Sequence, residues 1–262
     1  MNKILAICTS PDKGGLELYF VKLVNYYHNK KLPIISVCQD DSLISKIIKS
    51  PIFFVKKLGI LNILINAYTI SKKIRDKNIN IIHVSWTKDL LLAVLIKLFS
   101  KENISIIYYR QMKITRNKKD IYHRFIYKNI SRVLVITKQL QSDCQRYLPI
   151  APNKIIHLKY GIQIPNKVIN TKEGRKELYN RFNLDDQLFT IGVFSRIEEQ
   201  KGQHLVVEAL NSINNKAIQL LIIGHCMDNK YMDKLNNMID EFKLQKQISI
   251  TSFIESPMEL MP

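Results

Sequence analysis

The fold is decided by residues 192–204, Gly-Val-Phe-Ser-Arg-Ile-Glu-Glu-Gln-Lys-Gly-Gln-His. The first three residues end a short apolar segment, Leu188–Phe194, which is typical of a strand buried on both faces. A polar loop follows, and Gln203–Ile213 is predicted to form a helix. A strand, a short loop and a helix in this order make up the repeating unit of a parallel α/β sheet.

The same alternation runs through the rest of the chain. The short segments are rich in Ile and Val and apolar on both faces, so we expect strands at Ile4–Cys8, Pro33–Cys38, Ile79–Val84, Ile104–Tyr109, Val133–Ile136 and Ile155–Leu158. Between them, apolar residues at helical spacing predict helices over Leu16–His28, Asp89–Phe99 and Ile121–Asn129. The sequence therefore predicts an α/β fold with mostly parallel sheets.

A second series of strands and helices begins after Gly161. The segment Gln163–Thr171, with Pro165, is predicted to be a linker. Beyond it we expect further helices and strands at Lys172–Phe182, Ala217–Gly224, Tyr231–Phe242 and Ile248–Phe253. The predicted domains are therefore residues 1–163 and 164–262.

The stretch 44–74 differs from its surroundings, because lysines are scattered among its Ile, Leu and Phe residues. We predict a pair of surface helices here, interrupted at Pro51 and Gly59. The alternative is a basic amphipathic face that lies on an anionic membrane.

The chain is strongly basic, with 40 Lys and Arg against 22 Asp and Glu and a net charge of +18. Such an excess attracts nucleic acid, anionic lipid head groups or phosphorylated substrates. A composition rich in Lys, Ile and Asn is also typical of an AT-rich genome, so the charge alone does not select a partner. A nucleic-acid-binding protein stays open as a third reading, but it would need a clustered basic face or aromatic platforms. We expect no nucleic acid among the partners.

The cysteines and the apolar segments indicate the cellular compartment in which the protein resides. Cys8, Cys38, Cys144 and Cys226 are far apart, which predicts neither a zinc site nor a disulfide framework and fits a reducing compartment. The apolar start of the chain is too short for a signal peptide, and no run reaches the roughly 18 apolar residues of a spanning helix. We therefore expect a cytoplasmic protein.

Two basic residues in the opening stretch predict a binding site. Arg196 follows the strand directly, and Lys201-Gly202 precedes the next helix. Ligands of open α/β sheets bind at the carboxyl ends of the strands, and two cations at a helix N-terminus suit a diphosphate. The alternative is a solvated loop in which Arg196 pairs with Glu198 or Glu199.

Gly14-Gly15 and His83 are further candidates. Glycines after the first strand would let backbone N–H groups approach an oxyanion, although an ordinary strand-to-helix turn has the same residues. A histidine that closes an apolar strand, such as His83, is by itself more often a core residue than a catalytic one. The chain lacks Gly-x-Gly-x-x-Gly, which argues against a nicotinamide or flavin enzyme.

The pattern Ser-Arg-Ile-Glu-x-Gln-Lys-Gly-x5-Glu-Ala from Ser195 onward resembles the second-domain motif of the family 4 glycosyltransferases, retaining enzymes of the GT-B fold with two Rossmann-like domains. The resemblance implies that Arg196 and Lys201, with Gly202, bind the diphosphate of a nucleotide-sugar. It also implies that the turn at residues 14–15 lies near the donor phosphates and the acceptor, and that His83 approaches the donor sugar as the catalytic residue.

Other segments carry the same resemblance. Val133–Thr137 and Lys154–Ile162 are similar to the end of the family's first domain, and Arg110–Met112 with Lys118–Asp120 and His123 resembles the members that build lipopolysaccharide cores. The implied function is transfer of a sugar from a UDP- or GDP-linked donor to a glycan or lipid-linked acceptor in cell-surface polysaccharide synthesis. Neither a metal nor a cofactor is implied, because two basic side chains take the role of Mg²⁺. An anionic membrane surface at the inner face of the cytoplasmic membrane is an open partner.

The family pattern also includes a later Glu-x7-Glu motif, whose glutamates contact the donor sugar and ribose. The chain ends at Pro262 after about three strands of the second domain, where a doubly wound domain has five or six. We therefore expect the second domain to be truncated and the chain as printed to be a poor enzyme. The alternative is a non-catalytic remnant or a membrane-associated partner of an intact transferase.

Overall fold

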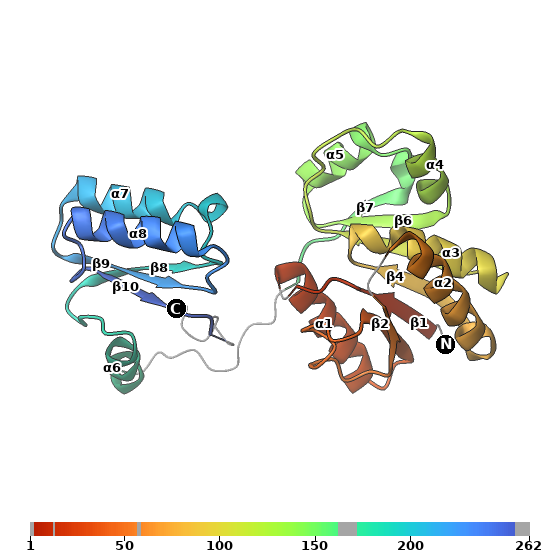
Figure 1. Ribbon diagram of the computed structural model, residues 1–262, viewed down its shortest axis with the longest axis horizontal. Helices are drawn as coiled ribbons and strands as arrows, with labels where there is room; N and C mark the ends of the chain where they lie inside the picture. The colour runs from red at the N-terminus through yellow and green to blue at the C-terminus, as the bar shows by residue number, and fades with distance from the viewer. Residues whose placement is uncertain (1–2, 13, 57–58, 162–171, 255–262) are drawn as a thin grey trace. The chain divides into compact units, whose positions relative to one another are not determined.

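A computed structural model describes residues 3–12, 14–56, 59–161 and 172–254. The chain divides into two compact units, Met1–Gly161 and Ile162–Pro262, drawn in Figure 1. The predicted division is at 163/164, and the predicted linker at 163–171 lies outside the described residues. The final residues, 255–262, lie outside them as well.

The N-terminal unit is built on a parallel sheet of seven strands in the order β3-β2-β1-β4-β5-β6-β7. Strands β2 and β3 extend the sheet to one side of β1, and β4 to β7 extend it to the other, so the strand order reverses between β1 and β4. Such a switch point opens a crevice at the carboxyl ends of the two strands. The strands are β1 Lys3–Ile7, β2 Ile34–Gln39, β3 Ile52–Val55, β4 Ile79–Val84, β5 Ser105–Arg110, β6 Ile130–Val135 and β7 Ile155–His157.

Helices cover the two faces of this sheet unequally. Helix α1 packs with Ala6, Cys8 and Ile34 on one face, and α2 and α3 lie side by side on the other, where Leu5, Ile7 and Ile82 point. The α-helices are α1 Gly15–Asn29, α2 Ile60–Ile74, α3 Leu90–Ser100, α4 Ile121–Lys128 and α5 Lys138–Tyr147, with short 3-10 turns η1 Arg75–Lys77, η2 Thr87–Asp89 and η3 Pro152–Lys154.

The sequence prediction was wrong for part of the stretch 44–74. Residues 52–55 form the edge strand β3 and not a helix, whereas the second half of the stretch is helix α2 as predicted. Pairing with β2 holds β3 in place, and Val55 is buried there. The run Ile-Phe-Phe-Val has neither helical nor alternating periodicity, so its strand state depends on the neighbouring β2. Helix α5 was not predicted, because only Leu140 and Cys144 of its residues are buried.

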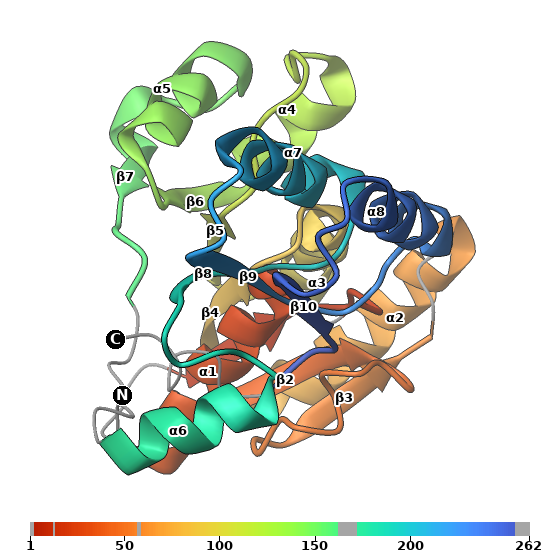
Figure 2. The same ribbon diagram turned by 90° about the vertical axis from the view of Figure 1, so that its left-hand side faces the viewer.

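The second unit has a smaller parallel sheet, with three strands in the order β10-β9-β8 among the described residues. Figures 1 and 2 show α7 and α8 side by side over one face of these strands, where Val207 and Leu235 pack against Leu220 and Ile222. The elements are α6 Lys172–Arg181, β8 Phe189–Phe194, η4 Glu199–Lys201, α7 Gln203–Ile213, β9 Ile218–Ile223, α8 Asn229–Glu241 and β10 Ile248–Thr251. Among the helices that the structure describes, none is long and apolar enough to cross a membrane.

Candidate functional site

The loop after β8 carries the predicted diphosphate ligands. Arg196 lies just past the end of β8, and the turn η4 then leads to Gly202, whose φ of 72° lies in the left-handed region. A side chain is strained at this φ, so the glycine lets the chain turn sharply from η4 into α7. The turn places the exposed Lys201 at the N-terminus of α7, the positive end of the helix dipole.

Arg196 has a partner in the structure. Its Nη2 lies 2.9 Å from Oε1 of Glu198, and its side chain is about half exposed, at 48%. The ion pair that the sequence offered as an alternative is therefore present. A guanidinium has five N–H donors in a planar fork, so Arg196 can keep this contact and still offer donors to a second anion.

The backbone on both sides of Arg196 is fixed by the segment that follows β9. A Cβ added to Gly224 would lie 1.7 Å from the carbonyl oxygen of Ser195, so only glycine permits this approach. Ile197 donates its N–H to the carbonyl of His225 at 2.9 Å, and its side chain is buried in the core of the unit. Arg196 thus stands between two residues whose positions are set by packing.

Gln203 adds a side-chain anchor to the same loop. Its side chain is fully buried, and its Nε2 donates to the carbonyl of Arg196 at 2.8 Å and to Oγ of Ser195 at 3.0 Å. Its Oε1 accepts from the hydroxyl of Tyr231 at 3.3 Å. All the polar atoms of the amide are therefore paired, which a buried amide requires.

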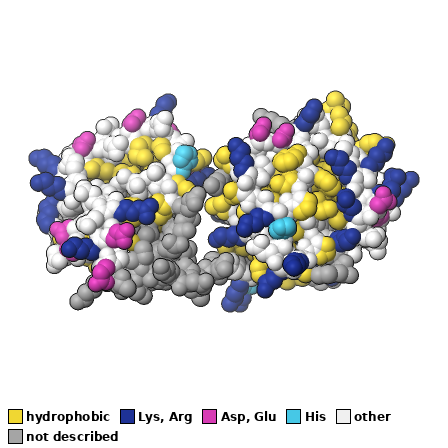
Figure 3. All heavy atoms as spheres, turned by 90° about the horizontal axis from the view of Figure 1, so that it is seen from below, with side chains coloured by type: hydrophobic (Ala, Val, Ile, Leu, Met, Phe, Trp, Pro, Cys, Tyr) yellow, Lys and Arg dark blue, Asp and Glu magenta, His cyan; other side chains and the backbone are white. Residues whose placement is uncertain are grey.

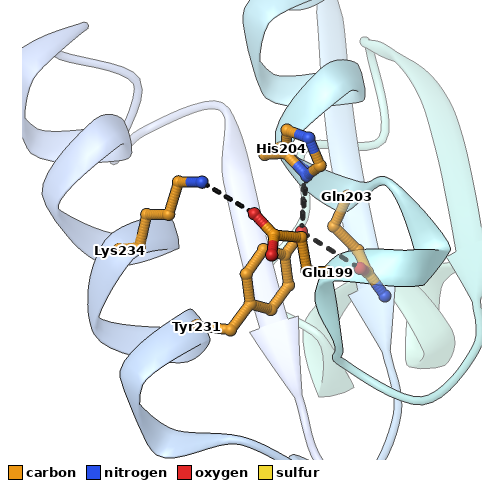
Figure 4. Close-up of polar contacts among 5 residues, drawn as sticks. All are labelled: Glu199, Gln203, His204, Tyr231 and Lys234. Atoms are coloured by element: carbon orange, nitrogen blue, oxygen red, sulfur yellow. Dashed lines mark hydrogen bonds and ion pairs between the residues drawn. The ribbon is translucent and has the colours of Figure 1, made fainter.

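Figure 4 shows how the two helices meet at the Tyr231 hydroxyl. Gln203 and His204 reach it from α7, and Tyr231 reaches it from α8. The hydroxyl accepts from the backbone N–H of His204 at 3.1 Å and lies 2.9 Å from Nδ1 of that residue. An exposed ion pair between Lys234 and Glu199 at 3.0 Å also joins α8 to η4. These contacts hold the loop between β8 and α7 against helix α8.

Sequence reasoning missed Gln203 as a functional residue. The available signal was its place on the apolar stripe of α7, with Val207 and Leu210 at i+4 and i+7, because an amide on a buried stripe requires partners. The partners themselves, Ser195 and Tyr231, lie in other elements, so no local pattern names them.

The glycine turn of the N-terminal unit begins α1. Gly14 precedes the first residue of α1, and its N–H donates to Oε2 of the buried Glu17 at 3.0 Å. The carboxylate of Glu17 therefore already occupies one of the donors that sequence analysis assigned to an oxyanion. A Cβ at Gly14 would lie 2.9 Å from that carboxylate oxygen, whereas the space at Gly15 is open. Leu18 donates its N–H to the carbonyl of Gly14 at 2.9 Å, so helix geometry leaves the N–H groups of residues 15–17 to meet an anion.

A buried carboxyl group ties this turn to the next strand. Asp89, at the end of η2, accepts from the backbone N–H of Thr9 at 2.9 Å and from its hydroxyl at 2.5 Å. Both residues are fully buried, and burial raises the pKa of Asp89 to about 7 although the bonds from Thr9 act to lower it. The bonds join the chain after β1 to the chain after β4, across the switch point. Sequence reasoning did not identify Asp89.

His83 is the next-to-last residue of β4 and pairs in register with Ala6 of β1. Its side chain is partly buried, with Nε2 3.3 Å from the hydroxyl of Ser85 and its ring centroid 6.2 Å from that of Tyr109. Burial lowers the pKa of His83 to about 4, because apolar surroundings disfavour the charged imidazolium. The imidazole is therefore neutral at pH 7.

An apolar cavity of about 220 Å³ opens beside His83, between α1 and the sheet. Tyr19 of α1 stands in it with its ring 5.1 Å from that of Tyr109 and 4.4 Å from that of Tyr160, measured between centroids. The remaining wall is mostly aliphatic and includes Ile81, Ile107, Leu134 and Leu158. Such a cavity suits an apolar group and aromatic stacking.

The residues that resembled lipopolysaccharide-core enzymes have structural partners. Arg110 is buried and donates to the hydroxyl of Tyr108 at 2.9 Å and to the carbonyl of Lys113 at 3.1 Å. Asp120 caps α4 by accepting from the backbone N–H of His123 at 3.1 Å. Contacts of this kind stabilise the loop and the helix start.

The structure thus gathers the predicted site residues into two groups. Gly14, Gly15 and His83 lie where β1 and β4 end, next to the switch point of the first sheet. Arg196 and Lys201 flank the loop after β8 in the second unit. In the part of the chain that the structure describes, no three His, Cys, Asp or Glu side chains are grouped to hold a metal ion.

Comparison with known proteins agrees with this geometry. Residues 174–261 match the family described as Glycosyl transferases group 1, and this match contains the whole Arg196–Lys201 loop. No curated protein matches the chain by sequence.

Solved structures match nearly the whole chain. HepE of Anabaena, in complex with UDP and glucose, has a TM-score of 0.78 at 16% identity, over 99% of this chain and 71% of HepE. A glycosyltransferase of Rickettsia africae has a TM-score of 0.83 at 18% identity, over 98% of this chain and 70% of its own. The lipopolysaccharide outer core galactosyltransferase WaaB has a TM-score of 0.66 at 14% identity, over 98% and 69%.

These likenesses show the fold. The predicted α/β architecture, with two Rossmann-like units and parallel sheets as in GT-B proteins, is confirmed, and the second sheet is the smaller one. Together with the family match over the second unit, the fold supports a glycosyltransferase.

We expect Gln203→Ala to weaken binding of a nucleoside diphosphate by about tenfold. The substitution leaves the Arg196 carbonyl and the Ser195 hydroxyl without their buried donor, which typically costs about 1–3 kcal/mol and frees the loop. Calorimetric titration measures the affinity, and urea denaturation measures the free energy of unfolding.

Gln245→Ala is the matched control, because Gln245 is an exposed glutamine with a bond to the side chain of Asp240. It should change the free energy of unfolding by no more than about 0.5 kcal/mol and leave the affinity unchanged. Equal effects of the two substitutions would refute the anchoring role of Gln203.

We expect His83 to titrate near pH 4 in the folded protein. An unfolded histidine titrates near pH 6.5, so between about pH 6.5 and 4 the unfolded chain binds more protons, and the contribution of His83 to stability falls as the pH falls. That contribution is fully present above pH 6.5. An NMR titration of the imidazole signals, assigned with His83→Gln, measures the pKa directly, and a value near 6.5 would contradict the burial argument.

Proposed function

We propose that this chain is a retaining glycosyltransferase of family 4 that uses a nucleotide-sugar donor. The observation that carries the proposal is the Arg196–Lys201 loop, in which two cations flank a short turn between the carboxyl end of β8 and the N-terminus of α7. Its backbone is held by Gly224 and Gln203, so the cations are supported before any ligand arrives. Preorganised positive charge is what transfer from a diphosphate needs.

The proposed roles follow from the chemistry of the leaving group. As the glycosidic bond breaks, negative charge grows on the diphosphate, and Arg196 and Lys201 stabilise it. Arg196 suits this role because its planar fork can bind two phosphate oxygens at once. Two side-chain cations supply the charge that a divalent metal supplies elsewhere, and we propose a reaction without a metal or other cofactor.

The N-terminal unit supplies the acceptor side. The neutral imidazole of His83 would donate or accept a hydrogen bond at a hydroxyl of the donor sugar, and N–H groups in the first turn of α1 would face an oxyanion. The aromatic cavity beside His83 fits the apolar face of a sugar or a lipid-linked acceptor.

Similar proteins support a particular donor and acceptor to test first. HepE binds UDP and UDP-glucose, and WaaB is a lipopolysaccharide outer core galactosyltransferase. We propose a UDP-linked sugar, with GDP as the alternative, and an acceptor in cell-surface polysaccharide or lipopolysaccharide synthesis. The proposed place of action is the cytoplasm, with a peripheral position at the inner face of the cytoplasmic membrane.

The decisive measurement is calorimetric titration with UDP and with GDP. We expect the chain to bind one of them, and we expect Arg196→Ala and Lys201→Ala each to weaken binding by about tenfold to a hundredfold, because each removes a charge-assisted contact worth about 1.5–3 kcal/mol. Lys246→Ala is the control: Lys246 is an exposed lysine that precedes β10, at the opposite edge of the same sheet.

Failure of the folded chain to bind either nucleotide would overturn the proposal, as would equal losses in the control. Transfer from labelled UDP-glucose or UDP-galactose to a lipopolysaccharide or glycan acceptor is the second measurement. Nucleotide binding without transfer would favour the non-catalytic partner over the enzyme.

A further inference from the structure

Helix α2 has two apolar stripes, and only one of them is buried. Ala67, Ile70 and Ile74 face the core of the unit. The second stripe points to solvent and consists of Leu61, Leu64, Ile65 and Tyr68, which are 71%, 45%, 56% and 53% exposed. Their spacing of i, i+3, i+4 and i+7 places them in one row. A contiguous apolar row on the solvent side of a helix typically marks a contact surface, so the second stripe calls for an apolar environment.

Lys72 adjoins this row, and Lys73 and Lys56 lie on the flank of the helix toward β3. Nζ of Lys72 lies 4.6 Å from the ring centroid of Tyr68, and Nζ of Lys73 lies 5.4 Å from that of Phe53 in the neighbouring strand β3. Asn66 donates to the carbonyl of Lys56 at 3.3 Å, which places the exposed Lys56 beside the middle of the helix. An apolar row with ammonium groups along its margin is the pattern of a helix that lies in a membrane interface.

The net positive charge of the chain comes from the unit that carries this helix. Residues 1–161 contain 28 Lys and Arg against 9 Asp and Glu, and residues 162–262 contain 12 against 13, which together make the 40 and 22 of the whole chain. Figure 3 shows hydrophobic side chains gathered on one face of the N-terminal unit, the right-hand body, with Lys and Arg around and between them. A partner for this unit must therefore be anionic, and a second copy would bring like charge against like.

We propose that the exposed row of α2, with Lys56, Lys72 and Lys73, binds the surface of an anionic lipid bilayer. The helix has 15 residues and is about 22 Å long, so it would lie in the plane of the interface with the row in the acyl boundary and the ammonium groups among the head groups. This proposal rests on the proposed function, because it assigns the peripheral membrane contact to a named helix. Its test uses no sugar donor.

Helix α4 is the competing surface within the same unit. Ile121, Tyr122 and Phe125 are 87%, 52% and 43% exposed, and basic residues accompany them. The helix has eight residues against 15 in α2, so it offers a shorter apolar row. We therefore assign the membrane contact to α2, and variants of α4 test that choice.

The experiment is sedimentation of the full chain with vesicles of phosphatidylglycerol and phosphatidylcholine in equal parts, and with phosphatidylcholine alone. We expect binding to the anionic vesicles that weakens as salt is raised. Leu64→Ser/Ile65→Ser and Lys72→Glu/Lys73→Glu should each weaken it by about tenfold or more, because each lysine near an anionic surface contributes about fivefold and charge reversal removes more than that.

Matched controls keep the outcome interpretable. Leu205→Ser/Ile213→Ser on α7 removes equally exposed apolar residues, and Lys243→Glu/Lys246→Glu reverses two exposed lysines of the second unit. Both should bind vesicles within about twofold of the unchanged chain. Circular dichroism and urea denaturation show whether the α2 variants are folded. Because neither measurement uses a nucleotide, this test stays separate from that of the proposed function.

Three results would overturn the proposal: no preference for anionic vesicles, undiminished binding by both α2 variants, or loss of binding in Ile121→Ser/Phe125→Ser while the α2 variants still bind. Loss in the α2 variants with retention in the α4 variant supports it.

Discussion

Parallel pairing brings the carboxyl ends of neighbouring strands to one edge of a sheet, and each group of candidate site residues depends on this constraint. In the N-terminal unit, β1 pairs with both β2 and β4, so the turn that starts α1 and the end of β4 with His83 meet at the same edge. In the second unit the pairing of β8 with β9 brings the Arg196 loop against Gly224. The position of each group of residues is thus a consequence of the strand order in its own unit.

Buried polar contacts then fix the positions of the residues that the strand order has brought close together. Thr9 and Asp89 are joined across the switch point, and Gln203 joins the Arg196 carbonyl to Tyr231 of the next helix. These contacts connect residues from different elements inside the core, where an unpaired polar group would be costly. A loop held in this way loses little conformational freedom when it binds an anion, which favours binding.

Burial acts in opposite directions on the two titratable groups near the switch point. It raises the pKa of Asp89 to about 7 and lowers that of His83 to about 4, in each case by disfavouring the charged form. At neutral pH the imidazole of His83 is therefore uncharged, and the carboxyl group of Asp89 is only partly ionised. Positive charge is carried by the surface of the N-terminal unit and by the Arg196 loop of the second unit. This separation fits the two proposals, in which the second unit binds a diphosphate and the N-terminal unit binds an anionic membrane.

The sequence by itself determined the alternation of strands and helices, because hydrophobic periodicity is a local property. Residues 79–84 and 203–213 form the predicted strand and helix with the predicted bounds. The residues of the loop between β8 and α7 suggested a diphosphate site only as one of two readings, and the resemblance to a family motif favoured it. Only the tertiary structure decided that residues 52–55 pair as an edge strand, that Asp89 binds Thr9, and that Gln203 anchors Arg196. The partners in the first two cases lie in separate strands and turns, and in the Asp89 pair they are 80 residues apart. No local pattern encodes such contacts, because they exist only once the order of the strands has been set.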